Sequence, residues 1–223
     1  MAIDRSVGQA LVSTAEAQLA RIGGAGCARH PHVLALTEAS GPHTGRDLSD
    51  AVHLLCSLHG RHPGVIELAL THCTDELARP WLSEAAEAFE RERLFLVRLT
   101  AAVGPVPSTP GAAETEASLL AQRHAIETLS ASERRGCALG AATALIGDWP
   151  AIRRILDRAA GRVGLDPPPS SLPDQDSVLG VIGTLAGNAA AERAIAFGGE
   201  QMLLQHRALF DLLEARAEAR SDY

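Results

Sequence analysis

The chain of 223 residues contains no lysine, so arginine supplies all 20 of its basic side chains. Alanine, glycine and proline are plentiful as well, and this bias is typical of a GC-rich gene rather than of a special use of arginine to bind phosphate or carboxylate groups. No cluster of five or more basic residues occurs, and the formal net charge is −7. Because nucleic acids and anionic membranes require a positive surface, we expect neither as a partner.

Further absences narrow the class of protein. Aromatic residues make up only 3% of the chain, which leaves few platforms for stacking the bases of single-stranded nucleic acid. No C-x-x-C motif occurs, and the four cysteines are far apart, which argues against disulfides and a cysteine-based zinc site. No uncharged stretch reaches the roughly 20 residues of a membrane-spanning helix, and the N-terminus lacks the apolar run of a signal peptide. The sequence therefore predicts a soluble, cytoplasmic protein.

Apolar residues recur at intervals of three and four along almost the whole chain, and the alternation typical of β-strands is not sustained anywhere. Hydrophobic residues make up 46% and charged residues 21%, as in an ordinary globular protein. We therefore predict an all-α fold in which residues 1–223 form a single multi-helix bundle domain. The expected helices cover residues 4–22, 33–39, 46–59, 63–78, 81–103, 112–129, 132–146, 149–160 and 176–220.

Two helix starts are predicted from capping residues. Ser130 and Glu133 have the spacing of a capping box. Asp148 fits the N-cap of a separate helix that has Pro150 in its first turn. A new helix is therefore expected to begin near each of these positions.

The C-terminal part of the chain combines a stiff connector with a long helix. Residues 166–175 are rich in proline and fit a rigid crossover connector. Small residues recur along one side of the last helix, 176–220, which favours close packing between helices over room for a ligand. We expect this helix to bend at residues 198–199. We also expect its apolar first part to be the buried central helix of the bundle.

The stretch HLLCSLHGRHPG, residues 53–64, holds three histidines and a cysteine. On a helical wheel His53 falls on the solvent side, and His59 lies at its boundary in the last turn, where the helix dipole favours a cation. Gly60 fits the residue that ends this helix, and Pro63 fits the first turn of the next. The stretch is therefore interpreted as one helix ending and another beginning rather than as a metal or catalytic site.

A second group of polar residues breaks the apolar pattern. These charged or imidazole side chains fall on the core-facing side of three predicted helices, where they would need partners. They are Glu92, Arg93, Arg123, Glu127, Glu192 and His206. If the loop after residue 103 folds two helices back antiparallel, Glu92 lies level with Arg123, and we expect a core ion pair between them. The six residues are either a structural network or a ligand-binding site.

The motifs of common enzyme sites do not occur. No E-x-x-H pair supports a ferritin-like di-iron centre, and no phosphate-binding loop or nucleophile elbow is present. Arginines among the six candidates favour an anionic ligand over a cation, so no metal ligands are assigned. Our leading hypothesis is a non-enzymatic bundle that binds a small anion or a protein partner.

Two alternatives stay open. One is a metal- or cofactor-dependent bundle enzyme of ferritin-like or haem-oxygenase-like shape that uses Glu92, Glu127, Glu192 and His206, with its cofactor unknown. The other is a structural homodimer with an exposed apolar helix face. The sequence does not decide whether the protein is an enzyme.

Two segments, AVHLLCSLHGRHPGVIE and GDWPAIRRILDRAAGRVG, together resemble an uncharacterised bacterial family of all-helical hypothetical proteins. The resemblance extends over most of the chain. It implies a helical domain and nothing about activity, ligand or partner.

Overall fold

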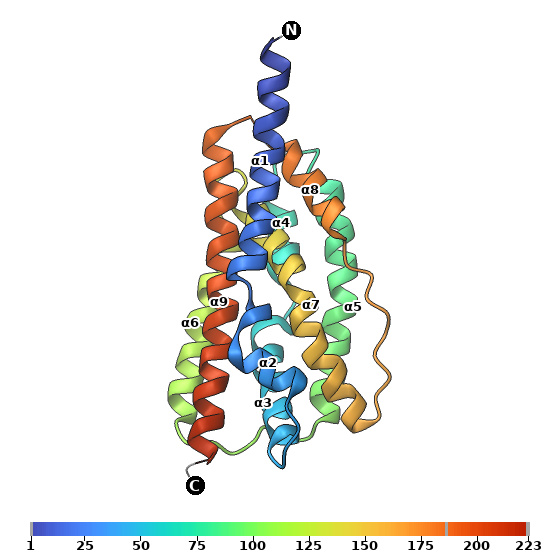
Figure 1. Ribbon diagram of the computed structural model, residues 1–223, viewed down its shortest axis with the longest axis vertical. Helices are drawn as coiled ribbons and strands as arrows, with labels where there is room; N and C mark the ends of the chain where they lie inside the picture. Colours follow the sequence, from blue (N-terminus) through green and yellow to red (C-terminus); the bar gives the residue numbers. More distant parts are fainter. Residues whose placement is uncertain (1, 186, 222–223) are drawn as a thin grey trace.

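The computed structural model describes residues 2–185 and 187–221, with side chains from Thr14 onward. The described residues form helices and no strands, so the predicted all-α fold is confirmed. In chain order these are α1 (Ala2–Ala25), the 3₁₀ helix η1 (Cys27–Arg29), α2 (Pro31–Glu38), α3 (Thr44–His59), α4 (Val65–His72), α5 (Arg79–Ala102), α6 (Ala112–Ser130), α7 (Cys137–Val163), α8 (Gln175–Thr184) and α9 (Ala189–Ser221). Figure 1 shows the long helices α1, α5, α6, α7 and α9 running roughly along the long axis of the molecule, with the two termini at opposite ends.

The central helix of the bundle is α7. Eighteen of its residues are buried, and it contacts α9, α3, α5 and α6 as well as the shorter helices. It runs without interruption through Pro150, so the predicted break before Asp148 is wrong. Proline in a helix interior costs about 3 kcal/mol, but the burial of α7 on nearly every side offsets this cost. As a result Asp148 is a buried mid-helix residue and not an N-cap.

Helices α7 and α9 cross at two glycines. A Cβ atom at Gly140 would collide with the backbone of Ile195, and one at Gly198 would collide with the carbonyl oxygen of Cys137. The two backbones therefore touch at a distance that only glycine permits. This confirms the interpretation of the small residues as helix packing for Gly198, whereas Gly180 and Gly183 in α8 have no atom within 4 Å of an added Cβ.

The predicted last helix is divided in two. Helix α8 ends at Thr184, Gly187 has a φ of 92°, and the side chain of Asn188 accepts a hydrogen bond from Ala190 N at 2.9 Å to begin α9. Helix α9 then continues through Gly198 and Gly199, where a bend was expected. Helix α8 lies at the side of the bundle against α1 and α7 rather than at its centre (Figure 1).

Other helix ends differ from the prediction by a few residues. Helix α1 continues through the glycine pair to Ala25, and α4 ends early at His72. Ser130 belongs to the last turn of α6 and donates its hydroxyl to Ile126 O, so it forms no capping box. The Pro-rich connector joins α7 to α8 and runs along α5, where Arg91 Nε donates to Ser171 Oγ at 2.8 Å.

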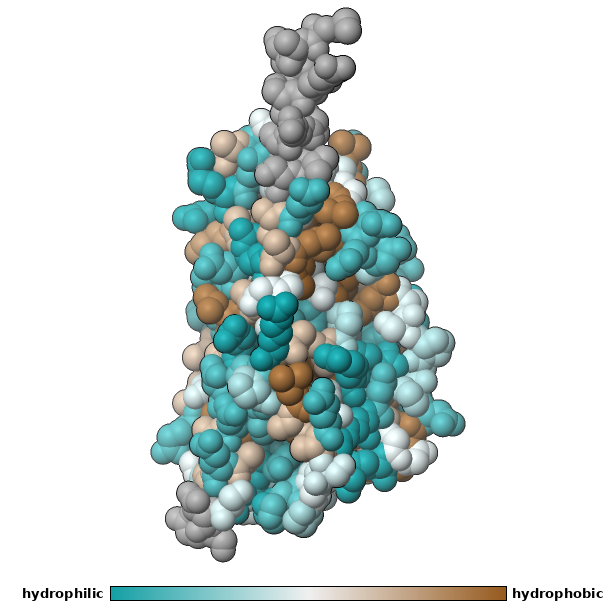
Figure 2. All heavy atoms as spheres, in the orientation of Figure 1, coloured by the Kyte–Doolittle hydropathy of each residue, from teal (hydrophilic) through white to brown (hydrophobic). Residues whose placement is uncertain are grey.

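Hydrophilic residues cover most of the face shown in Figure 2, and its hydrophobic residues gather in small groups, the most evident beside α1 and α8. No helix among the described residues is long and apolar enough to cross a membrane. Cys27, Cys56, Cys73 and Cys137 are all free thiols, as expected from their spacing.

Candidate functional site

The C-terminal end of α3 differs from the prediction in the position of one histidine side chain. His59 is buried, with 5% of its surface exposed, whereas the helical wheel placed it at the boundary with solvent. It follows Val52 and Leu55 at intervals of three and four, and all three residues are buried. Gly60 ends the helix as predicted, but α4 begins at Val65 rather than at Pro63. The imidazole of His59 therefore points into the protein.

His59 belongs to a chain of buried polar side chains that we call the histidine cluster: Cys27, His59, Asp148 and His206. His206 Nδ1 donates to Asp148 Oδ2 at 2.7 Å, and His206 Nε2 lies 3.2 Å from His59 Nε2, so one imidazole donates to the other. The other carboxylate oxygen of Asp148 accepts from the backbone N–H of Cys27 at 2.9 Å. Four separate elements, η1, α3, α7 and α9, therefore meet at this point.

Burial sets the protonation of two members of the cluster. It lowers the pKa of His59 well below the usual value, and electrostatic interactions with the neighbouring His206 and Arg93 lower it further. Burial also raises the pKa of the Cys27 thiol, with a further contribution from the negative charge of Asp148. At neutral pH His59 is therefore a neutral imidazole and Cys27 a protonated thiol.

Glu92 is buried next to this cluster. Its carboxylate accepts from Arg153 Nη1 at 2.7 Å and from Trp149 Nε1 at 3.0 Å. The Trp149 ring stands edge-on to the ring of His59, with the centroids 5.6 Å apart. Glu92 is thus satisfied by two donors from α7 and linked to the histidine cluster through an aromatic contact.

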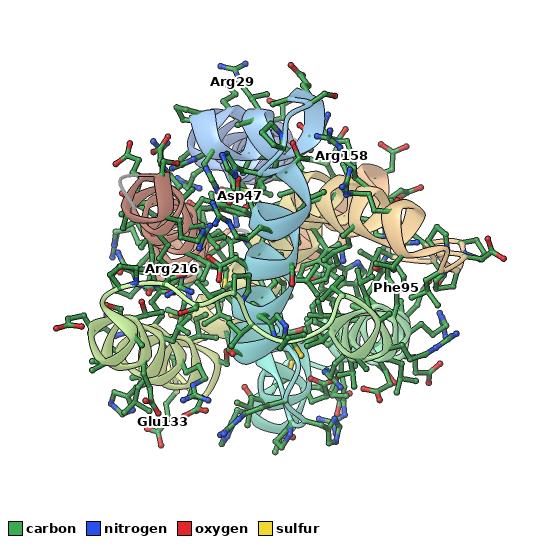
Figure 3. All side chains as sticks on the ribbon, turned by 90° about the horizontal axis from the view of Figure 1, so that it is seen from below. Arg29, Asp47, Phe95, Glu133, Arg158 and Arg216 are labelled. Atoms are coloured by element: carbon green, nitrogen blue, oxygen red, sulfur yellow. The ribbon has the colours of Figure 1, made fainter. Side chains whose placement is uncertain are left out.

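The predicted ion pair between Glu92 and Arg123 is wrong. Helix α6 packs against α3, α4, α7 and α9, and α5 packs against α3, α4 and α7, so the two helices share neighbours without packing closely on each other. Figure 3 shows the reason: the connection from α5 to α6 crosses the end of the bundle, so α6 is not folded back onto α5. Arg153, from the central helix, takes the place that the sequence assigned to Arg123.

Arg93 pairs with other acidic groups, on the side of α5 that faces α4. Its guanidinium donates to Glu67 and Glu90, and Nη1 lies 3.2 Å from His62 Nδ1. Glu67 also accepts from Gly64 N at 2.9 Å at the start of α4. Arg93 is therefore a packing residue that holds α4 on α5.

Arg123 and Glu127 lie beside the histidine cluster at the surface of α6. With His59 and Arg61 they line a pocket of about 30 Å³, roughly the volume of one water molecule. A larger groove of about 610 Å³ adjoins it between α3, α6 and the loop before α6, and Arg61 and Arg123 line both spaces. His59 therefore lies close to the surface through a narrow opening next to this groove.

The groove between α3 and α6, which we call the arginine groove, is lined by cationic, hydroxyl and apolar side chains. Arg61 and Arg123 make no hydrogen bond or ion pair with the described residues. Among described arginines that are at least half-buried, Arg123 is the one without such a partner. Glu116 is the one carboxylate among the lining residues. The remaining polar lining residues are His53, Ser57, Ser108, Thr109, Thr115 and Arg216.

A buried ion network adjoins the arginine groove through Arg216, which is one of its lining residues. Asp50, which is fully buried, accepts from Arg216 Nη2 at 2.7 Å and from Arg220 Nη1 at 2.5 Å. Arg216 also donates to Thr115 and Thr109. Figure 3 shows Arg216 and Asp47 at this end of the bundle. Asp50 was not among the predicted site residues, because its partners lie 166 and 170 residues away and a local pattern does not contain them.

Glu192 lies far from these sites. Its Oε1 accepts from Gly187 N at 3.3 Å in the first turn of α9, 14 residues before His206 and so about 21 Å from it along the helix. Glu127 is exposed, and Glu92 is paired with Arg153. The four ligands suggested for a metal-dependent enzyme, Glu92, Glu127, Glu192 and His206, therefore do not converge.

The fold and site define an all-helical protein with a buried histidine cluster next to an arginine-lined groove. The chain belongs to DUF6975, a family of unknown function, whose match covers residues 22–221. No curated protein and no solved structure matches the chain.

Proposed function

We propose that the protein binds a small organic anion in the arginine groove, with Arg123 and Arg61 as its charge partners. The observation that carries the proposal is the half-buried guanidinium of Arg123, which has no partner among the described residues although the chain has more acidic than basic residues. A guanidinium binds carboxylate and phosphate groups through two parallel hydrogen bonds. An anion at this position supplies the partner that the described residues do not.

The volume and lining of the arginine groove indicate the size and polarity of the rest of the ligand. Its volume of about 610 Å³ is within the range of small-molecule sites. Leu54, Val106 and Leu119 supply apolar wall, and the hydroxyl groups of Ser57 and Ser108 supply hydrogen bonds. The ligand class is therefore an acid with a short apolar part. A cytoplasmic setting is part of the same proposal, because the four free thiols fit a reducing compartment.

The first test is thermal unfolding in matched sodium salts of acetate, butyrate, hexanoate and phosphate, with chloride as the reference. We expect hexanoate to raise Tm more than acetate, because each buried methylene contributes about 0.8 kcal/mol, or about fourfold in affinity. The response should vanish in Arg123→Gln. Arg98→Gln is the matched control, since Arg98 is an exposed, unpaired arginine of α5 outside the groove. Equal Tm in all four salts and chloride, or an unchanged response in Arg123→Gln, contradicts the proposal.

A further inference from the structure

The histidine cluster holds a donor set that the function proposed for the arginine groove does not use. A thiol sulfur of Cys27, a carboxylate oxygen of Asp148 and a ring nitrogen of His206 all lie within 4.8 Å of one another. At most 2% of each residue is exposed. Sulfur, oxygen and nitrogen donors at this separation are those that Zn²⁺ prefers.

The local backbone is shaped to bring these donors together. Gly26 precedes Cys27, and a Cβ at Gly26 would collide with the Asp148 carboxylate, so only glycine allows η1 to approach α7 this closely. The backbone N–H of Cys27 holds one carboxylate oxygen of Asp148 and leaves the other facing His206. The close crossing of α7 and α9 brings His206 level with Asp148. Three elements are therefore fixed around one point.

His59 is not one of the three donors but is a hydrogen-bond partner of His206. When a histidine binds a metal through one ring nitrogen, its other nitrogen usually donates to a fixed acceptor. His206 Nδ1 faces Asp148, and His206 Nε2 lies 3.2 Å from His59 Nε2. With a metal on Nδ1, the proton of His206 resides on Nε2 and is donated to His59.

Two other groups of potential metal ligands are less suited to a buried zinc ion. In the group of His62, Glu67 and Glu90, the guanidinium of Arg93 already binds both carboxylates and supplies the cation. In the group of His30, Asp211 and Glu214, Asp211 is largely exposed to solvent. The Cys27, Asp148 and His206 group is the buried one of the three.

We infer that Cys27, Asp148 and His206 bind one Zn²⁺ ion, and that the hydrogen bond between His206 and His59 orients the His206 ring for binding. Binding replaces the thiol proton of Cys27 by the metal, and one proton is released to solvent for each ion bound. The ion links η1, α7 and α9, so its role is to hold these three elements together in the bundle core, next to the arginine groove. Because positions 27, 148 and 206 are far apart in the sequence, no short motif indicates this set of donors.

The test uses the full chain, expressed without a histidine tag and purified without chelator. Elemental analysis should give about one zinc per chain for the wild type and for Cys137→Ala, and none above background for Cys27→Ala. Cys137 is the matched control because it is an equally buried free cysteine. Arg123→Gln should retain the zinc, which separates this inference from the anion-binding proposal. A wild type without zinc, or zinc retained in Cys27→Ala, overturns it.

Cobalt titration of chelator-treated protein is the second readout. Co²⁺ bound to a thiolate gives a charge-transfer absorption in the near ultraviolet, which we expect in the wild type and not in Cys27→Ala. If Cys27→Ala does not fold, the single alanine variants of Cys56, Cys73 and Cys137 decide by elimination. Absorption in all three supports Cys27 as the thiolate ligand. Its loss in any of them, or its absence from the wild type, overturns the inference.

Discussion

Replacing Gly198 by alanine should destabilise the protein, although alanine is the better helix former. A Cβ at this position would stand about 1 Å inside the 3.0 Å limit of real Cβ contacts, against the carbonyl oxygen of Cys137. The atom in the way belongs to backbone, so no side chain can rotate to make room. Helices α7 and α9 must therefore separate locally.

The magnitude follows from two opposing contributions. Overpacking of a close interface costs about 1–3 kcal/mol, and the higher helix propensity of alanine returns up to about 1 kcal/mol. We expect a net loss of about 1–2 kcal/mol in the free energy of unfolding, which for a chain of this size lowers Tm by roughly 2–8 °C. The same separation weakens the contact between His206 and Asp148, since both belong to the helices that are pushed apart.

Urea denaturation followed by circular dichroism measures the change. Gly180→Ala is the control, because Gly180 is an exposed position in α8 with no atom within 4 Å of its added Cβ. The control should be stabilised by about 0.5–1 kcal/mol. If Gly198→Ala is as stable as the control, the close approach of α7 and α9 is not present in solution and the reasoning is refuted.

Two further predictions concern buried charge and pH. Glu92→Leu should cost about 3–5 kcal/mol in urea denaturation, because Arg153 and Trp149 lose their buried acceptor and Arg153 keeps only the partly exposed Asp157 as a charged partner. Glu87→Gln, on the exposed side of α5, should change stability by less than about 0.5 kcal/mol. A small loss in Glu92→Leu would show that the pair is solvated. Burial lowers the pKa of His32, so the folded state resists the proton that the unfolded chain accepts, and stability should fall as pH drops below about 6.5. The fall should be smaller in His32→Gln but unchanged in the exposed control His124→Gln. Equal pH profiles for all three proteins would exclude His32 as the source.

Local periodicity was enough to predict the class of fold and the bounds of several helices. The expected helices at residues 46–59, 81–103 and 112–129 agree with α3, α5 and α6 within two residues at each end. Their apolar stripes are strong, and each ends at a clear loop. Periodicity failed where tertiary burial outweighed a local signal, as in α7, which passes through Pro150 because it is surrounded by other helices.

The candidate site was predictable only in part. Five of the six candidates, Glu92, Arg93, Arg123, Glu192 and His206, are buried or half-buried, so the breaks in the apolar pattern were informative about position. Their partners were not, because the order of helices in space is set by the crossing of the α5–α6 connection and not by adjacency in sequence.

The site residues that were not predicted from the sequence each had another interpretation in their local sequence context. Asp148 looked like an N-cap, His59 looked like a helix end, and the distance of Cys27 from the other cysteines argued against a cysteine-based zinc site. One signal was available for His59, since it continues the apolar spacing of Val52 and Leu55. The contacts of Asp148 with Cys27 and His206 span 121 and 58 residues, and only the assembled bundle brings these side chains together.

The most direct test of anion binding is an NMR titration of the arginine side-chain Nε–Hε signals with sodium hexanoate, against sodium chloride at equal ionic strength. The Arg123 signal is identified by its loss in Arg123→Gln. Binding in the arginine groove predicts that this signal shifts and saturates, while the signal of the exposed Arg98 stays in place. A stationary Arg123 signal, or equal non-saturating shifts of Arg123 and Arg98, would contradict the claim that this guanidinium holds the anion.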